Sequence, residues 1–199
     1  MTQPDAAGQT LRLVVGLGNP GPDYARTRHN AGFRLVDRLA GDAPWRDNGD
    51  LGQVCRQGEL WLAKPMTYMN DSGSFVGHLV RWHKIDPGQI LVCFDDIALP
   101  LGRLRLRVKG SGGGQKGMES TLQNLGTQDV PRLRIGIGPQ PPGMDSARFV
   151  LSRFSPAEEK VLAAVLDYAA LAVRVAAESG LAAAMTRFNA PPKTEEAPG

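Results

Sequence analysis

The stretch Val14–Phe33 constrains the fold of this chain more than any other. The apolar run Leu11–Val15, interrupted only by one arginine, leads into it and is typical of a buried strand. Three glycines and two prolines then fall within Gly16–Pro22, and no regular element survives that density of breakers. A helical spacing of apolar residues follows His29. A strand therefore ends in a stiff loop that carries Asn19 and His29, and open α/β sheets place their chemistry at such strand ends.

The same loop contains a partial nucleotide-binding motif. Gly16–Gly21 matches the dinucleotide fingerprint G-x-G-x-x-G. That fingerprint requires backbone N–H groups aimed at a pyrophosphate and a helix that opens at once. Pro20 and Pro22 have no N–H, and Asp37, at the place of the expected acid, lies inside the helical pattern. A dinucleotide site is therefore disfavoured.

The rest of the chain alternates between strand and helix patterns. Strands are expected over residues 11–17, 53–56, 60–63, 89–94, 103–109 and 132–138, and helices over 30–40, 72–84, 115–125, 156–179 and 181–188. We expect residues 41–50 to be a loop. Strands that alternate with helices predict a three-layer α/β fold.

Composition bounds the class of protein. The 199 residues are 42% hydrophobic and 22% charged, which is ordinary for a globular protein. The two cysteines, Cys55 and Cys93, do not suggest a disulfide framework and favour a reducing compartment. The first ten residues lack the apolar core of a signal peptide, and no apolar run approaches membrane-spanning length. We therefore expect a cytoplasmic protein with one domain over residues 11–188, and disorder in residues 1–10 and 189–199.

Polar side chains gather at three strand ends. The first strand end offers Asn19 and His29, the second offers Asn70, and the third offers Asp95 and Asp96. A histidine with a carboxylate partner is a general base with a fixed tautomer. Nearby amides can donate to a developing oxyanion or hold a water. The pattern predicts water activated by His29, without a metal or a covalent intermediate, since no nucleophile-elbow serine and no H-x-x-H spacing occurs.

Each of these residues also has a structural interpretation. A histidine beside a helix start is often a cap or a surface residue, and Asn70 stands in a turn-like context. Asp95 could cap a local element, and Met69 and Tyr68 could belong to the core.

A basic segment follows the aspartate pair. Residues 103–109 alternate strictly between cationic and apolar side chains, which places four cations on one face of a strand. Seven Lys or Arg and only two acids lie between Leu99 and Arg134. The glycine-rich loop Gly110–Gly114 adds free backbone N–H groups that suit an anion. This combination indicates a nucleic-acid partner, although a solvated strand face would give the same alternation.

Several stretches, taken in order, resemble the bacterial-type peptidyl-tRNA hydrolase family. The matching stretches are Gly16–Gly21 with Tyr24, Thr27–Gly32, Lys64–Asn70 with Ser72 and Gly73, Asp95–Asp96, Leu99–Gly102, Arg132–Gly138 and Phe149–Leu151. They span roughly residues 11–188. Taken together and in register, these motifs make the resemblance specific.

The resemblance implies a single mixed-sheet α/β domain, mostly parallel, twisted and flanked by helices, with a C-terminal helical cover. It implies hydrolysis of the ester between a peptide and the tRNA 3′ ribose, by a monomer that needs no cofactor. By similarity, His29 is the general base, Asp95 rather than Asp96 is its partner, and Asn19 and Asn70 position peptide, water or the transition-state oxygen. The expected substrate and tRNA contacts are Tyr24, Tyr68, Met69, Gly113, Gly114, Gln115, Lys116, Arg105, Arg107 and Arg134.

The chain departs from the family pattern at two places. The family's glycine-rich loop usually ends Gly-Gly-His-Asn-Gly, whereas this chain has Gln115 and Lys116 at the His and Asn positions. The amide of Gln115 can keep a polar contact without a titratable group, and Lys116 can replace an amide contact by a phosphate contact. Ala98 stands where many relatives carry an acid.

Two other functions are compatible with parts of the sequence. One is an RNA-binding protein on the same fold that has lost hydrolysis, and the changed residues Gln115 and Lys116 are the feature in its favour. A nucleotide-dependent oxidoreductase is the other. A base, its acid partner and two amides together favour the hydrolase, because a protein that only binds RNA needs none of them.

Overall fold

The computed structural model of the chain describes residues 10–190. The disorder expected for residues 1–10 and 189–199 therefore falls almost wholly outside the described residues. Asn189, which is described, exchanges two hydrogen bonds with the backbone of Leu106, one from Leu106 N–H to Oδ1 at 2.6 Å and one from Nδ2 to the Leu106 carbonyl at 3.1 Å.

Within residues 10–190 the strands form one seven-stranded mixed sheet in the order β2-β3-β4-β1-β5-β7-β6. The four central strands are parallel, and both edges are closed by antiparallel pairs. The strands are β1 (Leu13–Gly16), β2 (Arg46–Asp47), β3 (Gly52–Gln57), β4 (Leu60–Pro65), β5 (Ile90–Pro100), β6 (Leu104–Arg107) and β7 (Arg132–Gly138). The carboxyl ends of β4, β1 and β5 consequently meet at one edge of the sheet.

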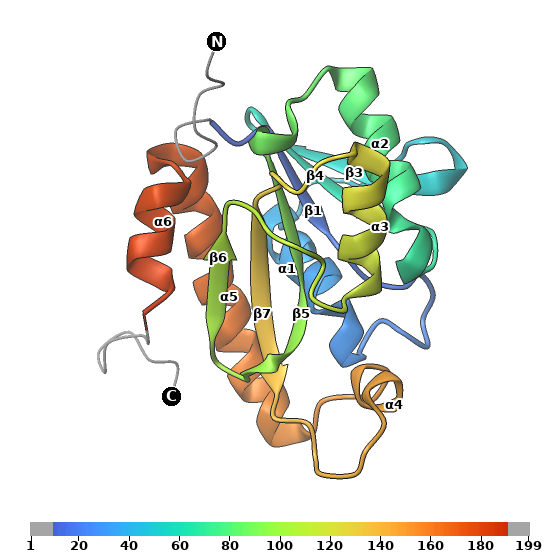
Figure 1. Cartoon of the computed structure of the whole chain (residues 1–199), viewed down its shortest axis with the longest axis vertical. Coiled ribbons are helices and arrows are strands. Elements are labelled where there is room, and N and C mark those ends of the chain that lie inside the picture. The colour runs from blue at the N-terminus through green and yellow to red at the C-terminus, as the bar shows by residue number, and fades with distance from the viewer. Residues whose placement is uncertain (1–9, 191–199) are drawn as a thin grey trace.

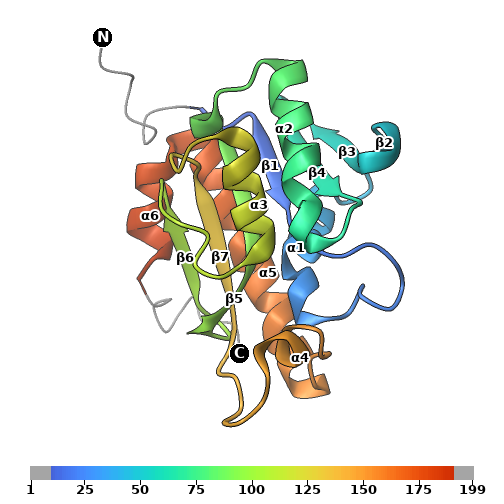
Figure 2. The ribbon, with the colours of Figure 1, turned by 45° about the vertical axis from the view of Figure 1, so that its right-hand side comes forward.

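Helices cover both faces of the sheet, as Figures 1 and 2 show. One face carries α1 (Ala31–Ala40), α5 (Pro156–Ser179) and α6 (Leu181–Phe188), and the other carries α2 (Ser72–His83) and α3 (Lys116–Leu125). A short helix, α4 (Ser146–Val150), lies beyond the carboxyl ends of the central strands (Figure 1). The expected three-layer α/β architecture is confirmed.

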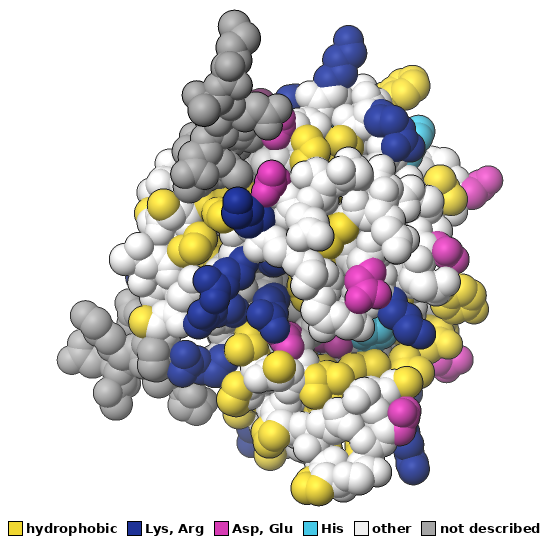
Figure 3. Space-filling view, in the orientation of Figure 1, with side chains coloured by type: hydrophobic (Ala, Val, Ile, Leu, Met, Phe, Trp, Pro, Cys, Tyr) yellow, Lys and Arg dark blue, Asp and Glu magenta, His cyan; other side chains and the backbone are white. Residues whose placement is uncertain are grey.

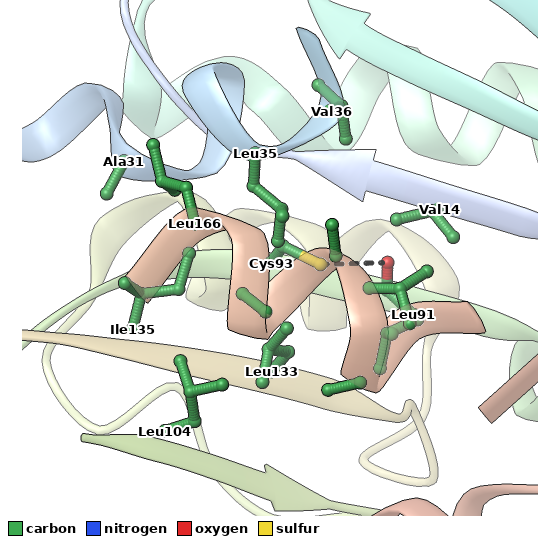
Figure 4. Packing of buried hydrophobic residues seen from close by; sticks show 14 of the residues in the cluster. Val14, Ala31, Leu35, Val36, Leu91, Cys93, Leu104, Leu133, Ile135 and Leu166 are labelled. Atoms are coloured by element: carbon green, nitrogen blue, oxygen red, sulfur yellow. Dashed lines mark hydrogen bonds between the residues drawn. The ribbon is translucent and has the colours of Figure 1, made fainter. Parts of the chain in front are cut away.

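Each helical layer encloses its own hydrophobic cluster. Between the sheet and α1 and α5, Val14, Leu35, Leu91 and Leu133 pack together with their neighbours (Figure 4). The opposite cluster joins Val15, Val92 and Phe94 to α2 and α3. Because alternate residues of β1 and β5 point to opposite faces, the apolar residues of these two strands contribute to both clusters.

The first loop uses a glycine for close packing. A Cβ on Gly16 would stand 2.3 Å from the carbonyl oxygen of Gly32, at the start of α1. The glycine of the apparent fingerprint therefore lets helix and strand approach, and the first α-helix does not begin until Ala31.

Several element boundaries differ from the expectation. We expected β5 to end before Asp95, but it continues to Pro100, because it pairs with β7 through a bulge between Asp96 and Pro100. Gly136 permits this approach, since a Cβ there would lie 2.0 Å from the Pro100 carbonyl oxygen. The helix α4 and the two-residue strand β2 were not expected. An Asp145 side chain that accepts from Arg148 N–H begins α4, and pairing with β3 forms β2.

Candidate active site

A cavity of about 1020 Å³ opens where the carboxyl ends of the central strands meet the glycine-rich loop and α4. Among the candidate residues, those that line it are Asn19, His29, Tyr68, Met69, Asn70, Asp95, Arg107, Gly113, Gly114, Gln115, Lys116 and Arg134. Two candidates, Tyr24 and Arg105, are not among the lining residues. Tyr24 is half-buried in the turn before His29, where its carbonyl accepts from Thr27.

His29 and Asp95 form a close pair. His29 belongs to the short 3-10 helix Arg28–Asn30, and its Nδ1 lies 2.9 Å from each carboxylate oxygen of Asp95. The Asp95 side chain is only 2% exposed and the His29 side chain 13%. A buried carboxylate beside Nδ1 selects the tautomer that carries its proton there. Nε2 is then left as a base, and the ring lines the cavity.

Asn19 is held by three hydrogen bonds. Its backbone N–H donates to Asn30 Oδ1 at 2.8 Å, and Asn30 Nδ2 donates to the Asn19 carbonyl at 2.9 Å. The side-chain oxygen of Asn19 accepts from Met69 N–H at 2.9 Å. Among the described residues nothing accepts from its Nδ2. Asn19 is therefore a fixed N–H donor at the wall of the cavity.

The loop after β4 supplies a second wall. The 3-10 helix Met69–Asp71 buries Met69 and leaves Asn70 exposed at the cavity. Tyr68 is 62% exposed and lies at the same rim. An exposed amide beside an aromatic ring suits contact with a ligand rather than core packing.

Gln115 has both ends of its amide engaged inside the protein. Its Oε1 accepts from Met118 N–H at 2.8 Å and so caps α3, while its Nε2 lies 3.3 Å from Asp95 Oδ1 and 3.3 Å from the sulfur of Met69. The next residue, Lys116, also lines the cavity.

Cations border the cavity on the side of β6 and β7. Figure 3 shows Lys and Arg side chains gathered over the region of β6, beside a hollow whose opposite wall carries hydrophobic side chains. Arg107, Lys109 and Arg134 line the cavity here, and Arg134 Nε forms an ion pair with Asp96. The two consecutive aspartates thus have different partners.

Two buried arginines escaped sequence reasoning. Arg132 donates to the carbonyls of Gly110 and Ser111 at 2.7 Å each and so supports the glycine-rich loop. Burial, and next the charge of Arg134, lower the pKa of Arg132 to about 10. The strict alternation Arg132-Leu133-Arg134 was the available signal for its position.

The other buried arginine is Arg28. Its Nη2 lies 2.7 and 2.8 Å from the carboxylate oxygens of Glu158, and its guanidinium stacks over Phe149 and Phe154. A further bond reaches the carbonyl of Ile137 at 3.2 Å. Arg28 thereby ties the segment that carries His29 to α4 and α5, and its only sequence signal was its place beside the histidine.

An open α/β sheet whose strand ends hold a His–Asp pair, a fixed amide donor and a basic border has the arrangement that general-base catalysis on an anionic ligand would require. The sequence matches the family model described as peptidyl-tRNA hydrolase over residues 13–197. The chain belongs to the peptidyl-tRNA hydrolase family, a family of enzymes.

Comparison with individual proteins gives the same family. The chain is 49% identical to the peptidyl-tRNA hydrolase of Elusimicrobium minutum over 185 residues, which cover 90% of this chain and 99% of that one. It is 52% identical to that of Chloroflexus aggregans over 185 residues, covering 89% and 98%. The crystal structure of the Acinetobacter baumannii peptidyl-tRNA hydrolase is similar with a TM-score of 0.82 and 33% identity, covering 92% and 98% of the two chains.

The described residues were also searched for other features. They include no helix that is long and apolar enough to span a membrane. Nor do residues 10–190 hold a cluster of three or more His, Cys, Asp or Glu side chains that could bind a metal ion.

Proposed function

We propose that the protein hydrolyses the ester bond between a peptide, or an N-blocked aminoacyl group, and the 3′ ribose of tRNA. The observation that carries this proposal is the buried Asp95 carboxylate 2.9 Å from His29 Nδ1, in a cavity that also presents a fixed Asn19 donor. Family membership supplies the substrate class, and the basic border supplies a place for the tRNA.

The chemistry begins at His29. Nε2 accepts a proton from a water molecule while the water oxygen attacks the ester carbonyl carbon. The imidazolium that forms is stabilised by the Asp95 carboxylate at Nδ1. No residue of the protein becomes covalently attached to the substrate in this scheme.

The amides act on the oxygen that becomes negative. Asn19 Nδ2 is the donor whose direction is fixed, because its Oδ1 is held by Met69 N–H. A preorganised donor of this kind stabilises a tetrahedral oxyanion more than the neutral carbonyl. Asn70, exposed at the second wall of the cavity, holds the peptide or the water. Collapse of the intermediate returns the proton from His29 to the departing ribose oxygen and releases tRNA.

The border of the cavity holds the nucleic acid. Arg107 and Lys109 of the β6 region, with Lys116 and Arg134, contact the phosphates of the tRNA acceptor end. The peptide lies on the side of Tyr68 and Met69. The protein acts as a monomer in the cytoplasm, in keeping with its free and buried cysteines and with a substrate formed in translation.

Release of N-acetylaminoacyl groups from tRNA tests the proposal, with unblocked aminoacyl-tRNA as the substrate control. Wild type should hydrolyse only the blocked substrate, and His29→Ala should lose turnover while it still binds tRNA. His78→Ala is the matched control, because His78 is exposed on α2 and stacks on Trp82 away from the cavity. Salt-dependent tRNA binding without turnover by wild type would instead indicate an RNA-binding protein.

A further inference from the structure

The Gln115 side chain bonds both the start of α3 and the Asp95 carboxylate. Its oxygen accepts from Met118 N–H at 2.8 Å, and its Nε2 lies 3.3 Å from Asp95 Oδ1. The orientation of the amide follows from this pair of contacts. A flipped amide would set NH₂ against the Met118 N–H and an oxygen against the carboxylate, and both contacts would be repulsive.

The start of α3 is also fixed in position. A Cβ on Gly117 would stand 2.4 Å from the sulfur of Met69, 3.0 Å from Leu17 and 3.2 Å from Gln115 Oε1. The first turn of the helix therefore packs directly against the loop after β4. This packing holds the Gln115 side chain next to Asp95, and the side chain has little freedom to turn toward a ligand.

The Asp95 carboxylate needs the donor that Gln115 provides. It is almost fully buried, and among the described residues only His29 Nδ1 and Gln115 Nε2 bond its oxygens. A buried carboxylate with too few donors is costly. His29 Nδ1 is equidistant from the two oxygens, so the ring alone does not select the rotation of the carboxyl group; the bond from Gln115 to Oδ1 does.

We propose that Gln115 is a positioning residue, which orients the Asp95 carboxylate toward His29 and partly offsets its negative charge, and is not a contact of the substrate. The inference rests on the proposed function of His29 and Asp95. It differs from the expectation that Gln115 binds the peptide or the acceptor end, and it leaves that contact to Lys116. It predicts an effect on kcat and on the pH profile with little effect on KM.

Other charged groups near His29 have to be separated from this effect. The elements packed against its segment are β5, α1 and α4. On β5 the charged groups are Asp95 and Asp96, on α1 Arg34 is paired with Glu159, and on α4 Arg148 is exposed. Across the cavity lie Arg107, Lys109, Lys116, Arg132 and Arg134. A substitution at Gln115 leaves all of these groups in place.

Two variants isolate the donor from the helix cap. Gln115→Glu keeps an oxygen for Met118 N–H, at a helix N-terminus where negative charge is favourable, but turns the donor to Asp95 into an acceptor. Gln115→Asn also keeps a capping oxygen, but its shorter side chain does not reach Asp95. Gln89→Glu is the matched control, because the Gln89 oxygen accepts from Asp86 N–H at the opposite end of β5.

Hydrolysis of N-acetylaminoacyl-tRNA is measured between pH 5 and 9. A second carboxylate favours the protonated imidazole, so Gln115→Glu should move the midpoint of kcat/KM upward by about one pH unit and recover activity at high pH. At neutral pH its kcat should fall about tenfold, with KM within about twofold of wild type. Gln115→Asn should shift the midpoint in the same direction by a few tenths of a unit. Gln89→Glu should match wild type.

A changed KM with an unmoved midpoint would overturn the proposal and return Gln115 to substrate binding. Unchanged kinetics in Gln115→Glu would overturn it as well. The ring-proton NMR signals of the histidines, followed in the pH titration without substrate, separate this failure from failure of the proposed function. If wild type lacks turnover, a shifted His29 titration in Gln115→Glu, with His78 and His83 unmoved, still supports the positioning role, and an unshifted one refutes it.

Discussion

Replacement of Asp95 by asparagine tests the proposed mechanism most directly, because the structure defines what the new amide meets. Gln115 always presents NH₂ to this position, since its oxygen is held by Met118. The oxygen of the substituted amide is therefore drawn to Gln115, and its own NH₂ faces His29 Nδ1. The ring must then carry its proton on Nε2, the atom that should accept a proton from water.

The size of the effect follows from the lost charge pair. With about 4 Å between the charge centres and an effective dielectric constant of about 20, imidazolium and carboxylate attract by about 4 kcal/mol. This attraction exists mainly when His29 has taken up the proton, so its loss raises the barrier and corresponds to a fall of about 10³ in kcat. The tautomer of His29 that carries its proton on Nε2 lowers kcat further, because Nε2 can then no longer accept a proton from water.

Single-turnover release of N-acetylaminoacyl groups is the assay, with tRNA affinity measured in parallel. Asp96→Asn is the control, since Asp96 pairs with Arg134 and not with His29; its kcat should stay within a few-fold of wild type. A fall of less than about tenfold for Asp95→Asn, with binding intact and chemistry rate-limiting, would refute the role of the carboxylate.

Three further outcomes are expected. Arg28→Met removes a buried guanidinium from Glu158 and should cost about 3 kcal/mol of folding free energy, which lowers Tm by about 6–12 °C in a domain of this size; calorimetry that shows no loss of stability would contradict this role of Arg28. Burial alone would raise the pKa of Glu158, but bonds from Ser155 N–H and Arg28 outweigh it and leave that pKa below its ordinary value of 4.5. A carboxyl group whose pKa is lower in the folded than in the unfolded protein stabilises the folded state at pH values above its unfolded pKa, and this stabilisation is lost as the pH falls through its folded pKa. The Tm difference between wild type and Arg28→Met should therefore narrow below about pH 4.5. Arg107→Gln should reduce the slope of log tRNA affinity against log salt by about one, and an unchanged slope would remove Arg107 from the phosphate contacts.

Elements with strong local signals were predictable from sequence. The bounds of α5, α6 and β7 agree with the expected ranges. For α5 the reason is local, since Ser155 and Glu158 form a capping box around Pro156. An apolar alternation bounded by such signals requires no knowledge of the rest of the fold.

Elements that depend on distant partners were not predictable. The extension of β5 beyond Asp96 exists because two glycines in β7 allow a bulged strand to lie close. The helix α4 is held in place by Phe149 against Arg28, 121 residues earlier in the chain. The sequence of neither segment indicates which distant residues it will pack against. Local propensity alone therefore predicted a loop for both.

The candidate site divides in the same way. Residue types at strand ends predicted His29, Asn19 and an aspartate, and the structure brings them together. The choice of Asp95 over Asp96 came from the family motif, because adjacent strand residues point to opposite faces and the sequence does not say which face holds the histidine. Gln115 was expected to face the substrate, since nothing in the loop sequence indicates that its two ends are both bonded internally.

Two amide side chains of the site are held in the same way. Asn19 and Gln115 each give their oxygen to a backbone N–H, Met69 and Met118 respectively. An amide held by its oxygen has its N–H donors pointing in one direction, at no cost of reorientation when charge develops. Asn19 aims that donor at the cavity and Gln115 aims it at Asp95. Because an amide does not titrate near neutral pH, both donors persist whether His29 is neutral or has taken up the proton from water.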